Sequence, residues 1–194
     1  MQTDDYPLTL LCHVATPAPV LRTIEARATL RADGALVIGY RLWGDMARLL
    51  IPTAQAAART DLLWEHTCFE AFVGRADDPA YREFNFSPSV QWAAYAFSDY
   101  RDPDDSVAPI SAPQITTRVF AGRLELDVSI APDALPDGTG KLIVGLSAVV
   151  EAADTVDGSH SYWALHHPSR RPDFHHRDAF ILELDGPAAP RNSA

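Results

Sequence analysis

Strict alternation of apolar and polar side chains is the feature that most constrains this chain. Residues 124–130 read Leu-Glu-Leu-Asp-Val-Ser-Ile, so the apolar side chains share one face of an extended strand and the polar ones the other. Residues 118–120 form a preceding strand, and the Ala-Gly-Arg step at 121–123 is typical of a hairpin turn between them. The pattern predicts a sheet with one buried face.

Further short segments have strand character, and turn residues separate them. Helical signal is sparse: residues 53–59 suggest a short helix capped by Thr53, and residues 133–135 a single turn. Strands without intervening helices predict an all-β fold, an antiparallel β-sandwich of jelly-roll or immunoglobulin-like type with ten or eleven strands and one or two short helices. The remaining predicted strands are 8–12, 24–30, 35–42, 68–73, 83–86, 91–97, 142–150, 162–165 and 179–184.

Size and composition favour a single domain. The chain has 194 residues, of which 47% are apolar, which is enough for one sizeable core. We expect one domain over residues 1–185. The Pro- and Ala-rich residues 186–194 have little to bury and predict a disordered tail.

The charge balance excludes several classes of partner. The chain has 16 Lys and Arg and 26 Asp and Glu, so its net charge is -10. This negative charge disfavours nucleic acid and anionic membranes as partners. No apolar run approaches the roughly 18–20 residues of a membrane helix. The acidic N-terminus lacks the pattern of a secretory signal, so we expect a cytoplasmic protein. Cys12 and Cys68 fit free thiols there, and no pattern indicates an oligomeric state.

The first candidate site segment is Leu-Trp-Glu-His-Thr-Cys-Phe-Glu-Ala-Phe-Val-Gly at 63–74. In an extended conformation Trp64, His66, Glu70 and Phe72 share one face. A carboxylate that faces inward among aromatic side chains needs a polar partner. The plainer interpretation is a solvated glutamate beside a core tryptophan.

The second candidate segment is 81–89, in which Glu83 and Asn85 point away from the apolar face. If this strand pairs with the preceding one, its polar row lies beside Glu70. Carboxylate and amide groups on one sheet face suit a neutral polyhydroxylated ligand, because hydroxyls both donate and accept hydrogen bonds. Arg82 has the opposite parity and needs a bulge or an edge position to join the site. An ordinary solvent-facing polar row is an equal alternative.

The third candidate segment is rich in histidine. Five of the seven histidines lie within residues 160–176, which raises the question of a metal site. Their spacing matches no metal-binding motif, so we interpret them as loop histidines, with His175 or His176 tying a loop to the sheet. We therefore predict no metal and no cofactor.

Motifs for catalysis are also missing from the sequence. It contains no Gly-x-Ser-x-Gly elbow, no Gly-rich phosphate loop and no dinucleotide fingerprint. A Glu70–Glu83 pair could serve a glycosidase, but only geometry can decide that.

Taken together, the segments 63–74, 81–89, 92–97, 162–165 and 172–180 resemble the bacterial DOMON-like proteins, which are related to family 9 carbohydrate-binding modules. The resemblance spans roughly residues 5 to 185. It implies a β-sandwich that binds a ligand on a sheet face, with Trp64 and Trp163 as two aromatic walls. It further implies Glu70 as the acidic hydrogen-bonding residue and Asn85 at a matching strand position.

We therefore expect a non-catalytic domain that binds a small ligand, a carbohydrate, by aromatic stacking and by carboxylate and amide hydrogen bonds. Three alternatives stay open: a heme-binding DOMON-type module that pairs Met46 with His160 or His166, a carbohydrate-active enzyme, and a scaffold or interaction protein with both tryptophans in its core. The candidate ligand-binding residues are Trp64, Glu70, Asn85, Trp163, Arg82 and His66.

Overall fold

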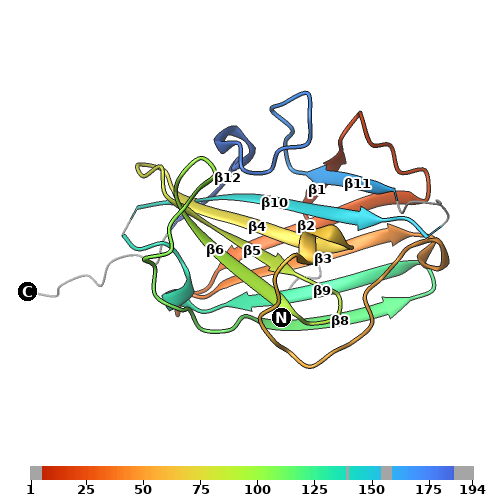
Figure 1. The fold of residues 1–194 in the computed structure, drawn as a ribbon, viewed down its shortest axis with the longest axis horizontal. Helices are drawn as coiled ribbons and strands as arrows, with labels where there is room; N and C mark the ends of the chain where they lie inside the picture. The colour runs from red at the N-terminus through yellow and green to blue at the C-terminus, as the bar shows by residue number, and fades with distance from the viewer. Residues whose placement is uncertain (1–5, 139, 154–158, 186–194) are drawn as a thin grey trace, which may run out of the picture.

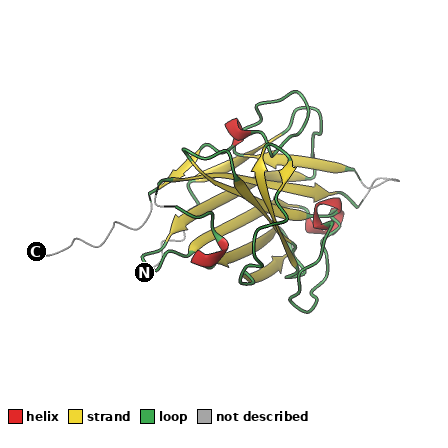
Figure 2. Cartoon of the chain, turned by 60° about the vertical axis from the view of Figure 1, so that its left-hand side comes forward, coloured by secondary structure: helices red, strands yellow, loops and turns green. Residues whose placement is uncertain are grey.

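The chain forms two antiparallel β-sheets that pack face to face (Figure 1, Figure 2). The computed structural model describes residues 6–138, 140–153 and 159–185. Their strands follow one continuous path of neighbours. Sheet A holds, in spatial order, β2 (Leu21–Leu30), β3 (Leu36–Gly44), β9 (Arg123–Ile130) and β8 (Gln114–Phe120). Sheet B holds β7 (Asp102–Pro103), β6 (Trp92–Asp99), β5 (Tyr81–Phe86), β4 (Cys68–Arg75), β10 (Leu142–Glu151) and β11 (His160–Ala164), with β12 (Leu182–Leu184) also paired to β10.

Strand β1 (Leu8–Cys12) joins the two sheets. Its first part pairs with β2 of sheet A, where Leu10 lies opposite Ile24. Its last part pairs with β11 of sheet B, where Cys12 lies opposite Trp163. This crossing makes the sandwich continuous along one side.

The core between the sheets follows from the alternation in the sequence. Leu124, Leu126, Val128 and Ile130 are all buried there, as residues 124–130 predict. From sheet B, β4 contributes Phe69, Ala71 and Val73. The intervening side chains of β4 therefore point to the outer face of sheet B.

A second apolar cluster covers part of that outer face. Phe72 of β4 and Tyr81 of β5 pack there against Phe174 and Phe180 from the C-terminal segment. Gly145 lets this segment approach β10 closely, because a Cβ atom at this position would lie 2.9 Å from the Phe180 ring. The C-terminal segment thus covers part of the outer face of sheet B.

The observed fold confirms the predicted all-β antiparallel sandwich. The described residues contain twelve strands, one more than the upper prediction, and two of them are very short. The helices in the described part of the chain are single 3-10 turns, and none of them is long and apolar enough to span a bilayer. They are η1 (Met46–Arg48), η2 (Leu63–Glu65), η3 (Pro132–Ala134) and η4 (Arg177–Ala179).

Of the two predicted helical segments, one is confirmed and one is wrong. The turn at 133–135 is confirmed as η3. The helix predicted at 53–59 is wrong: the segment has no regular secondary structure, its residues are all exposed, and Arg59 forms an isolated bridge with Trp92. A helix this short is marginal in water without a face to bury. Cys12 and Cys68 are free thiols, and the predicted tail at 186–194 lies outside the described residues.

One hydrogen bond across the core gives a stability prediction. The buried Tyr40 hydroxyl of sheet A donates to the main-chain carbonyl oxygen of Glu70 in sheet B at 2.7 Å. Tyr40→Phe should lower the free energy of unfolding by about 1 kcal/mol, because the ring packing against Phe69 remains while the hydrogen bond is lost. Urea denaturation measures this change. An unchanged unfolding midpoint would show that the bond does not help to hold the sheets together.

Candidate ligand-binding site

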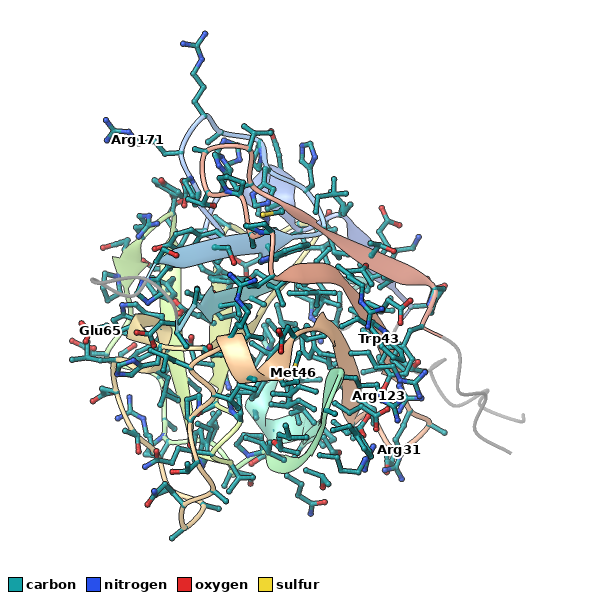
Figure 3. The ribbon with its side chains drawn as sticks, turned by 90° about the vertical axis from the view of Figure 1, so that its right-hand side faces the viewer. Arg31, Trp43, Met46, Glu65, Arg123 and Arg171 are labelled. Carbon is teal, nitrogen blue, oxygen red and sulfur yellow. The ribbon has the colours of Figure 1, made fainter. Side chains whose placement is uncertain are left out.

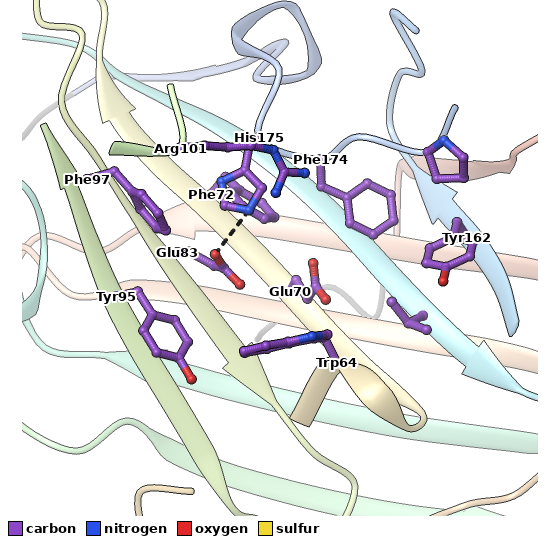
Figure 4. Close-up of a pocket in the computed structure, with 12 residues that line it drawn as sticks. Trp64, Glu70, Phe72, Glu83, Tyr95, Phe97, Arg101, Tyr162, Phe174 and His175 are labelled. Carbon is purple, nitrogen blue, oxygen red and sulfur yellow. Dashed lines mark ion pairs between the residues drawn. The ribbon is translucent and has the colours of Figure 1, made fainter. Parts of the chain in front are cut away.

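A cavity of about 420 Å³ lies over the outer face of sheet B (Figure 4). Its floor is formed by outward side chains of β4, β5 and β6. Its rim comes from η2, β11, Arg101 and the segment around Phe174. Such a volume falls within the usual range for small-molecule sites.

Two carboxyl groups form the centre of the floor. In the β4–β5 register Glu70 lies opposite Asn85, and Phe72 lies opposite Glu83. Glu70 and Glu83 are therefore diagonal neighbours on one sheet face. Both are buried, with only 3% and 6% of their surface exposed.

Neutral polar groups hold both carboxyls in place. The side-chain amide of Asn85 donates to Glu83 Oε1 at 2.7 Å. The Ser147 hydroxyl of β10 donates to Glu70 Oε2 at 3.4 Å. These contacts orient the carboxyl groups without supplying a counter-charge.

Burial and proximity both disfavour ionisation of this pair. Burial is the larger cause that raises the pKa of Glu70 well above its usual value, and the charge of Glu83 adds to it. Burial also raises the pKa of Glu83, although the Asn85 hydrogen bond and the Arg101 charge lower it in part. The two groups titrate together, so they retain a proton at a pH where an exposed glutamate has lost its own.

His175 is the third polar group over the floor. The Arg101 main-chain N–H donates to the Tyr81 hydroxyl oxygen at 3.1 Å, and the Tyr81 hydroxyl is hydrogen-bonded to His175 Nδ1 at 2.8 Å. The His175 Nε2 atom faces Glu83 Oε2 at 3.4 Å (Figure 4). Burial, and next the Arg101 charge, lower the pKa of His175 to about 4, so the ring is neutral at physiological pH.

Aromatic side chains surround the polar floor. Tyr95 and Phe97 of β6 lie on one side of the carboxyls, and Phe174 and Tyr162 lie on the other (Figure 4). Trp64 borders the cavity with 38% of its surface exposed, and its ring meets Tyr95 edge-on at 5.8 Å. The cavity thus combines apolar walls with a floor that can both donate and accept hydrogen bonds.

Trp64 reaches the cavity from a turn and not from a strand. The extended conformation predicted for 63–74 is interrupted by η2, which follows Leu62 in the left-handed region at φ 63°. A non-glycine residue there is uncommon, and the turn lifts the indole above the sheet. The strand begins only at Cys68, so Glu70 and Phe72 keep their predicted face.

The other predicted residues divide into supporting and outlying ones. Asn85 is fully buried and lies behind Glu83 without lining the cavity. His66 is exposed and contacts Glu151 at 3.0 Å, outside the lining. Arg82 points to the opposite face, where its Nη1 donates to the Ala134 carbonyl at 2.8 Å, since the β4–β5 register is regular there.

The predicted role of Trp163 is wrong. Its ring is 6% exposed, belongs to the core between the sheets, and donates through Nε1 to the Ser161 hydroxyl at 3.0 Å. Trp163 lies opposite Ala148, a core residue, so strand parity turns its neighbour Tyr162 outward. The two-tryptophan clamp is therefore absent among the described residues, and Tyr162 lines the cavity in place of Trp163.

Several residues that line the cavity were not predicted from the sequence. The sequence does contain a signal for Tyr95 and Phe97, because they alternate with alanines on β6. Tyr95 lies opposite Glu83 of β5, so both aromatic side chains point to the same sheet face as Glu83. Arg101 and Phe174 come from loops, for which alternation gives no direction. The prediction that His175 ties a loop to the sheet is confirmed by its contacts with Tyr81 and Glu83.

The surroundings of the histidines and of Met46 bear on the metal and heme alternatives. Within the described ranges, no group of three or more His, Cys, Asp or Glu side chains could hold a metal ion. Met46, labelled in Figure 3, packs in the sandwich core. His160 Nε2 contacts the Glu65 main-chain carbonyl at 2.9 Å. Met46 and His160 thus have other neighbours in this fold, and His166 is exposed.

Comparisons with known proteins relate the fold to carbohydrate-binding proteins. No family model and no curated protein sequence matches the chain. Among solved structures, a candidate carbohydrate-binding protein from Bacteroides uniformis aligns with a TM-score of 0.63 at 16% identity, over 92% of this chain and 84% of that one. At these identities the likeness shows a shared fold.

Two further similar structures are of a family 9 carbohydrate-binding module from Caldicellulosiruptor kristjanssonii. The glucose complex aligns with a TM-score of 0.56 at 10% identity, over 92% of this chain and 83% of that one. The cellotriose complex aligns with a TM-score of 0.57 at 10% identity, over 96% and 86%. The sandwich implied by the sequence resemblance is thereby confirmed, while membership of the DOMON-like group stays a prediction.

The different places of the two tryptophans predict different effects of their removal. Trp163→Ala should lower the free energy of unfolding by about 3–5 kcal/mol, because it leaves a cavity in the core. Trp64→Ala should lower it by less than about 1 kcal/mol, since the ring is partly exposed. Chemical denaturation of both variants tests the assignment. Equal losses of stability would contradict it.

The buried carboxyls predict a pH dependence of stability. Below the usual glutamate pKa of 4.5, Glu70 is protonated in both the folded and the unfolded state. Above 4.5 the unfolded chain releases this proton first, so the wild type loses up to about 1.4 kcal/mol per pH unit until the folded carboxyl also ionises. Glu70→Gln should remove this loss and become the more stable protein as the pH rises.

Unfolding of wild type and Glu70→Gln across the pH range measures this difference. His175 contributes the opposite trend, because its lowered pKa destabilises the fold as the pH falls from 6.5 towards 4. The His175 contribution to the free energy of unfolding is present in both proteins, so it cancels in the difference between them. A difference that does not change with pH would contradict the buried state of Glu70.

Proposed function

We propose that this protein binds a carbohydrate in the cavity over sheet B and does not transform it. The observation that carries the proposal is the partly exposed Trp64 ring beside two buried carboxyls in one cavity. Apolar C–H faces of a sugar ring pack on aromatic rings, and sugar hydroxyls need both donors and acceptors nearby. The fold shared with modules solved with glucose and cellotriose supports the same class of ligand.

In this proposal Trp64 supplies the stacking surface. Glu70 and Glu83 bind the hydroxyls, since a carboxylate accepts hydrogen bonds and a carboxyl that has kept its proton also donates one. Asn85 acts as a positioning residue through Glu83. An affinity in the micromolar to millimolar range, roughly -4 to -8 kcal/mol, suits a site with one principal stacking ring.

Binding is favoured over hydrolysis by the placement of the carboxyls. A glycosidase uses two carboxyl groups that flank the scissile bond. Here Glu70 and Glu83 rise from adjacent strands of one floor, on the same side of any ligand above them. A cytoplasmic location and a DOMON-like relationship stay predictions from the sequence.

Removal of the stacking ring tests the proposal. Trp64→Ala should weaken sugar binding by about 1–3 kcal/mol, measured by calorimetric titration with glucose and cello-oligosaccharides. Phe120→Ala is a matched control, because Phe120 is 43% exposed and lies on β8 of the other sheet. Unchanged affinity in Trp64→Ala, with the fold intact, would remove the stacking role. Absence of binding to any saccharide tested would remove the function itself.

A further inference from the structure

The cavity carries a surplus of negative charge. Of the described residues that line it, Arg101 is the single cationic one, and its guanidinium is paired with Asp173 at 3.0 Å. His175 is held neutral by burial, as its lowered pKa shows. Among the described residues, no Arg or Lys forms an ion pair with Glu70 or Glu83, and the Arg101 charge lowers the raised pKa of Glu83 only in part.

Neutral hydrogen bonds do not remove this imbalance. The contacts to Glu70 and Glu83 from within the fold come from an uncharged hydroxyl, an uncharged amide and a neutral imidazole. A buried carboxylate is strongly stabilised by a nearby positive charge and poorly by neutral donors alone. The pair keeps a proton for this reason, and a positive group above the floor would replace it.

The walls of the cavity favour the same kind of ligand. Six aromatic rings line the cavity around the two carboxyls, and the face of an aromatic ring attracts a cation through its quadrupole, most strongly where water is excluded. A neutral sugar uses these rings only for packing. A cationic group gains both from them and from the carboxyls. The rings belong to Trp64, Phe72, Tyr95, Phe97, Tyr162 and Phe174.

We propose that the cavity selects a saccharide that bears a protonated amine, an amino sugar, with its ammonium group between Glu70 and Glu83 and its ring against Trp64. This inference rests on the proposed carbohydrate-binding function and specifies its ligand class. One ammonium charge matches one ionised carboxylate of the pair, while the second carboxyl keeps its proton and binds a hydroxyl. An acidic sugar is excluded by repulsion from the floor.

The charge of the ligand can be tested with three sugars of one ring shape. Glucose, glucosamine and N-acetylglucosamine are titrated into the full chain at neutral pH in a calorimeter. Glucosamine should bind at least about tenfold more tightly than glucose, which corresponds to ~1.4 kcal/mol. N-acetylglucosamine, whose nitrogen is uncharged, should bind no more tightly than glucose.

The role of the carboxyls is tested by the ratio of the two affinities. In the double variant Glu70→Gln/Glu83→Gln the preference for glucosamine over glucose should fall to about twofold or less, because neither position can then supply a carboxylate. Glu65→Gln is the matched control, because Glu65 belongs to the same turn as Trp64 but its side chain is exposed outside the lining (Figure 3). This variant should keep the full preference, which separates a local effect from the overall charge of the protein.

The outcomes separate this inference from the proposed function. Equal binding of glucose and glucosamine would overturn the inference and leave carbohydrate binding in place. A preference for glucosamine that survives in the double variant would overturn the placement of the ammonium group. If none of the sugars binds, the proposed function fails, and the inference fails with it.

Discussion

The parity of two neighbouring strands governs both the fold and the site of this protein. On β4 and β5, one set of side chains, with Phe69, Ala71 and Phe84, seals the core against sheet A. The alternate set places Glu70 and Glu83 on the opposite face. A register shift of one residue would bury both carboxyls in the sandwich core, so the register is strongly fixed. The same alternation along β4 and β5 thus places the core residues on one face of sheet B and the site residues on the other.

Burial of two carboxyls on the outer face is costly, and the structure meets the cost with neutral partners and an apolar cover. Asn85 and Ser147 each donate a hydrogen bond to one carboxyl oxygen, and His175 Nε2 lies 3.4 Å from a third. The rings that exclude water from the carboxyls are also the walls available to a ligand. Departures from a plain sandwich surface of this kind are expected at functional sites, where stability is given up for recognition.

The sequence predicts the sandwich and the floor of the site, because both depend on local alternation. Prediction from the sequence fails where tertiary contacts decide which way a side chain points. Strand β11 has aromatic residues at two successive positions, so alternation alone cannot decide whether Tyr162 or Trp163 faces the core. Its register with β10 decides it. Phe174 and His175 lie on a loop whose path is fixed by packing on β4 and by the close approach that Gly145 permits.

The most direct test of the account is a saccharide titration followed by the indole N–H signals of the four tryptophans in nitrogen-15 NMR spectra. The Trp64 signal should shift progressively to saturation, because its ring borders the cavity, while the Trp163 signal stays in place inside the core. A saturable shift of Trp163 with Trp64 unaffected would contradict the site described here. An unchanged spectrum at saturating saccharide would contradict carbohydrate binding at this cavity.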